Sequence, residues 1–201
     1  PFAAQLLRTF VQAFGCEVTV LEAQERVLPL EDEEVSVEVA RSYGEQGVRI
    51  LAKAQLESLE VMPSHVSARI RGGQEVGPVQ VEAVLIAVGV VGNVEGLGLE
   101  LTGVKVESGR IVADAFGATA DPRVHAIGDV TGGPWLAHRA MHQGIACVER
   151  IRGLSGGHAL KPEDVPGCTY GYPQTASIGL TEEAARKRGL SFKVGKFPLE
   201  G

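Results

Sequence analysis

Asp129 and its neighbours form the segment of this sequence whose residue types are best suited to bind a ligand. The apolar residues at 124–127 predict a short buried strand, which ends at Gly128 and Asp129. A doubly wound sheet presents its ligand contacts at the carboxyl ends of such strands. The sequence Gly-Gly-Pro at 132–134 then allows a close turn. Asp129 is therefore predicted to be a ligand-binding carboxylate.

The residues after this turn predict a helix whose N-terminus can face the same ligand. Four residues open it: Trp135, Leu136, Ala137 and His138. An apolar pattern continues the helix to Ile151. The first backbone N–H groups of a helix have no partner within it, and they carry a partial positive charge that can bind a polar or negative ligand. The alternative is an ordinary strand, turn and helix in which the aspartate only caps the helix.

The histidine and cysteine residues do not form a recognisable metal or redox motif. His138 and His142 are four residues apart, a spacing that can bind a metal, but the sequence offers no third ligand beside them. Cys16, Cys147 and Cys168 lack CxxC and CxxxxC spacing. Each cysteine is predicted to be a small buried side chain rather than a reactive thiol. We therefore predict no metal site and no catalytic residue in this chain.

Glu22 is a second candidate for ligand binding. It closes the apolar run at 18–21, which predicts a buried parallel strand. An acidic residue at the end of the second strand of a dinucleotide-binding fold can bind the ribose hydroxyls of NAD and repel the extra phosphate of NADP. The alternative is a solvated glutamate at a strand end. Apolar spacing over residues 2–14 predicts a helix before this strand, but no GxGxxG is present, so we expect the phosphate-binding turn to lie upstream of residue 1.

The remaining patterns predict the elements that hold these candidates in place. Residues 30–47 predict a surface helix with one buried face. Residues 48–81 contain short strand patterns separated by turn residues and predict a small antiparallel meander. The most continuous apolar run, at 83–88, predicts a buried strand that ends at Gly89. Without a side chain, Gly89 lets a nucleotide or another backbone approach closely.

Composition and charge exclude two classes of partner. The formal net charge of −6 over 201 residues is spread along the chain, and no Lys/Arg-rich run is present, so nucleic acid is not an expected partner. No apolar run approaches the roughly 20 residues that span a bilayer. The N-terminus also lacks the pattern of a secretory signal. We expect a cytoplasmic protein with no membrane partner.

The sequence AIGDV, with GGP and LAHRA following at this spacing, resembles the second flavin-binding motif of the pyridine nucleotide-disulfide oxidoreductases. The dihydrolipoyl dehydrogenases are the most similar group. VTVLE followed by RVLP is similar to the NAD domain of the same family. The resemblance implies that Gly128 and Asp129 bind FAD, with the carboxylate on the ribityl chain, and that residues 135–138 meet the pyrimidine edge of the flavin. It also implies that Glu22 binds the ribose of NAD and that Leu56 lies near the adenine.

Two departures from the family pattern lie close to the predicted cofactor-binding residues. Val90, Val91 and Gly92 stand where relatives usually carry two arginines and a proline, so no charged contact is predicted after Gly89. His125 stands where an aromatic residue often precedes AIGD. Neither departure alters the predicted strands, and Gly89 remains a predicted cofactor-binding position.

The resemblance implies an α/β fold of partial FAD- and NAD(P)-binding doubly wound, Rossmann-like domains, with a small antiparallel meander and the start of an α+β dimerisation domain. The predicted domains are an NAD-binding domain at 1–88 without its first strand and glycine-rich turn, a second FAD-binding segment at 89–160, and the start of the dimerisation domain at 161–201. In the last of these, Thr181 is predicted to cap a helix that runs to Arg188. A strand is predicted at 192–197.

The function implied for a complete family member is oxidation of a dihydrolipoyl dithiol by a CxxxxC disulfide, with electrons passing to FAD and then to NAD. The dithiol is carried by an acyltransferase or carrier protein, and the enzyme is a homodimer. The disulfide motif and the His-Glu base pair are absent from this sequence, so the chain is interpreted as an internal fragment without redox turnover of its own. The alternatives are a non-catalytic scaffold or binding module, or a mercuric or glutathione reductase relative. The reductases are disfavoured because they generally prefer NADPH and Glu22 indicates NAD.

Overall fold

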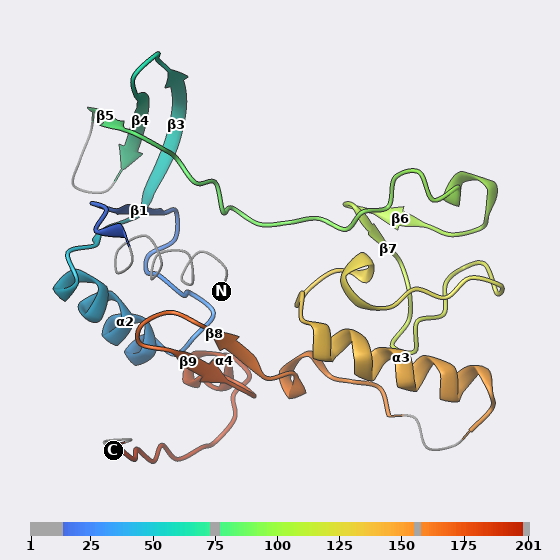
Figure 1. Cartoon of the computed structure of the whole chain (residues 1–201). Coiled ribbons are helices and arrows are strands. Elements are labelled where there is room, and N and C mark those ends of the chain that lie inside the picture. Colours follow the sequence, from blue (N-terminus) through green and yellow to red (C-terminus); the bar gives the residue numbers. More distant parts are fainter. Residues whose placement is uncertain (1–13, 73–76, 155–157, 199–201) are drawn as a thin grey trace. The chain divides into compact units, whose positions relative to one another are not determined.

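The computed structural model describes residues 14–72, 77–154 and 158–198. The chain divides into two compact units (Figure 1). The first unit combines Pro1–Ala87 with Cys168–Gly201, and the second is Val88–Gly167. The helix predicted from apolar spacing over residues 2–14 lies almost entirely outside the described residues. Within the described ranges, no helix has both the length and the apolar character needed to cross a bilayer.

A parallel strand pair and one helix form the centre of the first unit. β1 (Thr19–Glu22) lies parallel to β2 (Arg49–Ala52), and α2 (Glu33–Glu45) forms the connection between them. Parallel neighbours need such a crossover, because a short turn cannot return the chain to the same end of the sheet. Val39, Tyr43 and Val48 form a buried hydrophobic cluster in this unit. The parallel strand predicted to end at Glu22 and the helix predicted within 30–47 are both confirmed, but β1 is partly exposed rather than buried.

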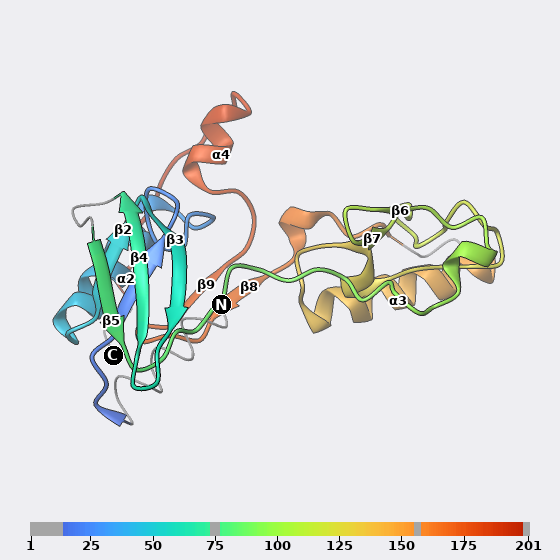
Figure 2. The same ribbon diagram turned by 90° about the horizontal axis from the view of Figure 1, so that it is seen from above.

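An antiparallel meander follows in the first unit. Its three strands are β3 (Ala54–Val61), β4 (Val66–Gly72) and β5 (Gly77–Val81), paired in that order (Figure 2). The predicted meander is therefore confirmed, but its predicted start at residue 48 is wrong. Residues Arg49–Ala52 pair with β1 instead, and Lys53 turns the chain with a φ of 54° before the meander begins. Apolar periodicity alone does not distinguish these two kinds of pairing.

The C-terminal segment adds a strand pair and a short helix. β8 (Gly167–Thr169) pairs with β9 (Thr175–Ser177), and α4 (Glu182–Lys187) follows. The Thr181 hydroxyl accepts a hydrogen bond from Ala184 N at 3.1 Å, which satisfies one of the free N–H groups of the first turn. The predicted cap of this helix is therefore confirmed.

Polar contacts tie this C-terminal segment to the start of α2 within the first unit. Asp32 Oδ1 accepts a hydrogen bond from Glu182 N at 2.7 Å, and Arg26 forms an ion pair with Glu183 at 3.3 Å. Glu31 Oε1 accepts a further hydrogen bond from a serine hydroxyl in β9 at 3.1 Å. The acidic residues before α2 therefore anchor a segment about 150 residues away in sequence, in addition to favouring the helix N-terminus.

The second unit is built on one long helix with short elements around it. α3 (Ala137–Ile151) confirms the helix predicted to reach Ile151. The shorter elements are η2 (Leu99–Leu101), β6 (Val106–Glu107), β7 (Arg110–Ile111), η3 (Gly128–Thr131) and η4 (Pro162–Asp164). The buried residues of α3 are Arg139, Ala146 and Cys147. The apolar residues that suggested this helix, including Ile145 and Val148, are exposed.

Three predicted strands are wrong. Residues 83–88 and 192–197 form no strand, and residues 124–127 contribute only an isolated bridge between His125 and Ala118. A strand exists through hydrogen bonds to a neighbouring strand, and no described strand pairs with these segments. The apolar run at 83–88 is exposed.

The three cysteines are free thiols with different environments. Cys147 is buried in α3 and Cys168 is partly buried, but Cys16 is exposed. The prediction that all three are buried is therefore wrong for Cys16. This residue lies in the exposed stretch of 14–17 that precedes β1.

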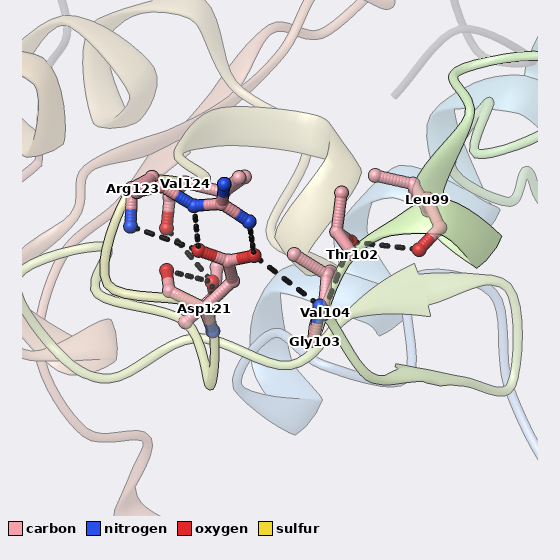
Figure 3. A network of polar contacts seen from close by, with 8 residues as sticks. Leu99, Thr102, Gly103, Val104, Asp121, Arg123 and Val124 are labelled. Carbon is pink, nitrogen blue, oxygen red and sulfur yellow. Dashed lines mark hydrogen bonds and ion pairs between the residues drawn. The ribbon is translucent and has the colours of Figure 1, made fainter.

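A network around Asp121 fixes the loop that leads to Gly128 (Figure 3). The Asp121 side chain is 5% exposed. Its Oδ1 accepts hydrogen bonds from Arg123 N at 3.0 Å and Nε at 3.1 Å, and its Oδ2 accepts from Arg123 Nη2 at 2.9 Å and Gly103 N at 3.3 Å. The Arg123 side chain, followed by the two backbone N–H groups, holds the pKa of this carboxyl well below its usual range.

The stability of the second unit is expected to depend on pH through Asp121. Because its pKa is lower in the folded than in the unfolded chain, its contribution is full above the unfolded pKa near 3.8 and is lost as the pH falls toward the folded pKa. Asp121→Asn should therefore lower the urea midpoint at pH 7, and the difference from wild type should shrink below about pH 4. In Arg123→Gln the pKa of Asp121 in the folded chain should rise. The stabilising contribution of this carboxylate should therefore be smaller and should be fully lost at a higher pH than in the wild type. A difference between wild type and Asp121→Asn that stays the same at pH 3 and pH 7 would contradict this assignment.

Candidate functional site

The turn before α3 is fixed by close packing on the helix and by hydrogen bonds with side chains. Gly128 is buried with a φ of 69°, and a Cβ at this position would lie 2.9 Å from the Ala140 side chain. Gly128 N donates to Gln143 Oε1 at 2.9 Å, and Thr131 Oγ1 donates to Gly128 O at 2.8 Å. The turn is therefore packed closely on α3, as only a glycine in this conformation allows.

Asp129 combines a fixed backbone with an open side chain. Its carbonyl oxygen accepts hydrogen bonds from Gly132 N at 3.0 Å and from Trp135 Nε1 at 3.3 Å. The side chain is exposed, and its carboxylate makes no hydrogen bond or ion pair to the described residues. A carboxylate held in this way can accept hydrogen bonds from an external ligand without first breaking an internal one.

The N-terminus of α3 is also open. Its N-cap is Leu136, which supplies no side-chain acceptor, and the first turn contains no acidic residue. The free N–H groups of Ala137 and the next residues therefore remain available to an external acceptor. Trp135 stands beside this turn and is 44% exposed. His138 is partly buried, and its Nε2 donates to Pro166 O at 2.8 Å, because a carbonyl can only accept.

The sequence reasoning missed Arg139, which lies behind this turn. Its side chain is buried, with the residue only 8% exposed. Nη1 donates to Gly132 O at 2.6 Å and to Pro134 O at 3.1 Å, and Nη2 donates to Thr131 Oγ1 at 3.3 Å. Burial lowers the pKa of this guanidinium, and the nearby Asp129 opposes that shift. The signal in the sequence was its spacing, because position 139 shares a helical face with the apolar Ala146.

The candidates in the first unit are Glu22 and Leu56. Glu22 is the last residue of β1, and its Oε1 accepts a hydrogen bond from Gln24 N at 2.8 Å. The side chain is partly buried at the carboxyl end of a parallel strand, where dinucleotide-binding sheets present their contacts. Leu56 lies in β3 beside a register shift and is 39% exposed.

Gly89 lies in the second unit, in an extended segment rather than at the end of a strand. Its φ is 127°, a conformation that side chains rarely adopt, and a Cβ there would meet nothing within 4 Å. A shallow hollow is lined by Val88, Gly89, Val90 and Val91. The structure thus assembles one continuous group of candidates, from Gly128 to His138, in the second unit.

Comparison with known proteins decides the family. The family model described as pyridine nucleotide-disulphide oxidoreductase matches residues 2–144, and the model of its dimerisation domain matches residues 165–201. The chain belongs to the pyridine nucleotide-disulphide oxidoreductases. The family resemblance inferred from the motif around Asp129 is therefore confirmed, as is the α/β fold followed by the start of a dimerisation domain.

Curated relatives within this oxidoreductase family are named dihydrolipoyl dehydrogenase. The chain is 44% identical to the Zymomonas mobilis protein over 192 residues, which is 95% of this chain and 41% of that protein. It is 40% identical to the Rhizobium etli protein, covering 94% of this chain and 40% of that one. The chain thus spans about two fifths of the length of these relatives.

Solved structures of family members have the same fold. LpdA from Mycobacterium tuberculosis matches with a TM-score of 0.82 at 26% identity, covering 93% of this chain and 40% of that chain. The HOCl-induced flavoprotein disulfide reductase RclA from Escherichia coli matches with a TM-score of 0.80 at 27% identity, covering 92% of this chain and 42% of that chain.

Proposed function

We propose that this chain is part of a flavin-dependent disulfide oxidoreductase of the dihydrolipoyl dehydrogenase type. The complete protein would oxidise a dihydrolipoyl dithiol to the lipoyl disulfide and reduce NAD to NADH. The observation that carries the proposal is the open turn from Gly128 to His138 in a chain that is 44% identical to a dihydrolipoyl dehydrogenase. Relatives with that name across several bacteria support the same substrate class.

The residues of this turn fit FAD. The exposed Asp129 carboxylate can accept hydrogen bonds from the hydroxyls of the ribityl chain. The uncapped first turn of α3, from Leu136 to His138, can donate backbone N–H groups to the carbonyl oxygens at the pyrimidine edge, with Trp135 beside it. Gly128 allows the turn to pack closely on α3. FAD would supply the two-electron chemistry between the dithiol and NAD.

The residues of this chain would therefore bind and orient the cofactors, and none is assigned a catalytic role. Glu22 would hold the ribose hydroxyls of NAD, since one of its oxygens is fixed by Gln24 N and the other makes no hydrogen bond to the described residues. Leu56 would lie near the adenine, and Gly89 would permit a close backbone approach.

The partners follow from the same proposal. The match of residues 165–201 to a dimerisation domain supports assembly with a second copy of the protein. The dithiol substrate would be a dihydrolipoyl group on an acyltransferase or carrier protein. We further propose the domain division 1–88, 89–160 and 161–201.

The first experiment is the intact mass of the denatured protein, read together with the visible absorption spectrum of the native protein. A flavin spectrum and a mass well above 21.2 kDa would lead to an assay with dihydrolipoamide and NAD. NADH formation in that assay supports the proposed function. A protein that contains no flavin and does not reduce NAD would instead favour a non-catalytic scaffold.

Asp129→Ala is expected to weaken FAD binding by about 10- to 100-fold. A hydrogen bond to a charged group contributes about 1.5 to 3 kcal/mol, and 1.4 kcal/mol corresponds to a factor of ten. The dissociation constant can be measured by quenching of flavin fluorescence on titration of the apoprotein. Asp164→Ala, which removes another exposed carboxylate of the second unit, should bind FAD as the wild type does. Equal affinity of both variants would remove Asp129 from the site.

A further inference from the structure

We propose that Arg139 is the positioning residue of the flavin-binding turn. This inference rests on the proposed function and goes beyond it, because it assigns FAD affinity to a side chain that faces the protein interior. Arg139 would set the distance and orientation between Asp129 and the first turn of α3.

The hydrogen bonds of Arg139 span the connection between these two groups. Its guanidinium donates to Thr131 Oγ1, Gly132 O and Pro134 O, three acceptors within four consecutive residues. Asp129 lies two residues before this stretch, and α3 begins three residues after it. One planar side chain in α3 therefore fixes the backbone that joins the open carboxylate to the open helix N-terminus.

The charge of Arg139 is also directed at the turn. The guanidinium is buried and stays protonated, and a buried cation needs compensation from its surroundings. In the described part of the chain its hydrogen-bond acceptors are all uncharged oxygens. The negative charge that favours its protonated form is Asp129.

A structural role alone would not require a guanidinium. The second unit already holds this turn through the Gly128–Gln143 hydrogen bond and through the close contact with Ala140. Lysine preserves the positive charge at position 139 but lacks the planar set of donors that reaches several acceptors at once. Comparing Arg139→Lys with Arg139→Gln therefore separates the effect of the positive charge on FAD affinity from the effect of the planar set of donors.

The test uses the complete gene product, prepared as apoprotein, with FAD titrated by fluorescence and thermal unfolding recorded without FAD. We expect the FAD dissociation constant to rise about tenfold in Arg139→Lys and about a hundredfold in Arg139→Gln. The flavin absorption spectrum of the bound fraction should also shift, because the pyrimidine contacts move. Arg152→Gln, at the exposed C-terminal end of the same helix, should match the wild type in every measurement.

Two outcomes overturn this proposal and leave the proposed function intact. If both variants bind FAD with the wild-type constant and spectrum, Arg139 does not position the site. If the apoproteins unfold at lower temperature while their folded fraction binds FAD normally, the role of Arg139 is only structural. A wild-type protein that binds no FAD overturns the proposed function together with this inference, whereas normal wild-type binding with unaffected variants overturns this inference alone.

Discussion

Replacing Gly128 with valine is expected to lower FAD affinity more than tenfold and to reduce the free energy of unfolding by about 2 kcal/mol or more. A left-handed backbone costs a residue with a Cβ roughly 1 to 2 kcal/mol, and Gly128 has a φ of 69°. Its Cβ would also lie 2.9 Å from Ala140 Cβ, so the turn must move away from α3. That movement would separate Asp129 from the helix N-terminus. Urea unfolding and flavin titration measure the two effects.

Variants at Gly153 and Ala140 separate the steric effect from the backbone effect. Gly153 has nearly the same φ, 68°, and a Cβ there meets nothing within 4 Å. Gly153→Ala should therefore show only the backbone cost, and Gly128→Ala should cost more. Combining Gly128→Ala with Ala140→Gly removes the clashing methyl group and should recover FAD binding, at a cost of about 1 kcal/mol for glycine in a helix. If Gly128→Ala and Gly153→Ala are equally destabilising, the close contact with α3 is unimportant.

The elements that could be predicted from the sequence are those whose packing partners are close along the chain. β1 and α2 belong to one strand, helix and strand unit, so the apolar pattern of each is buried by the other. The apolar run at 83–88 carried an equally strong strand pattern but forms no strand. A pattern records only the residues of one segment, whereas a strand also requires a neighbour with free hydrogen-bonding groups.

The sequence predicts those parts of the candidate site that depend on the type of a side chain. It does not predict the parts that depend on backbone carbonyl groups accepting hydrogen bonds. Asp129 stands out because a carboxylate after an apolar run is visible in the sequence. Arg139 donates hydrogen bonds to Gly132 O and Pro134 O. Every residue has a backbone carbonyl, so the sequence does not show which carbonyl groups point toward a helix. The apolar pattern that predicted α3 runs through Ile145, which is exposed, and gave no indication that Arg139 is buried.

Replacing Glu22 with alanine is expected to reduce the preference for NAD over NADP by about 10- to 100-fold in kcat/KM. Hydrogen bonds from ribose hydroxyls to a carboxylate contribute about 1.5 to 3 kcal/mol, and the same charge repels the extra phosphate of NADP. Glu22 Oε1 is held by Gln24 N, which leaves the other oxygen for the ribose. The alanine variant lacks both the hydrogen bonds to the ribose and the repulsion of the phosphate, so NAD should bind more weakly and NADP more strongly. Steady-state kinetics of the complete protein with each nucleotide gives the ratio.

Glu22→Gln separates the charge from the local structure. Glutamine retains an oxygen that can accept from Gln24 N, so the end of β1 should keep its conformation while the repulsion of NADP is lost. Most of the change in nucleotide preference should therefore already appear in this variant. Glu17→Ala removes an exposed carboxylate just before β1 and should leave the preference unchanged. If Glu22→Gln and Glu17→Ala both retain the wild-type preference, Glu22 is a solvated residue at a strand end, and the nucleotide is selected elsewhere in the protein.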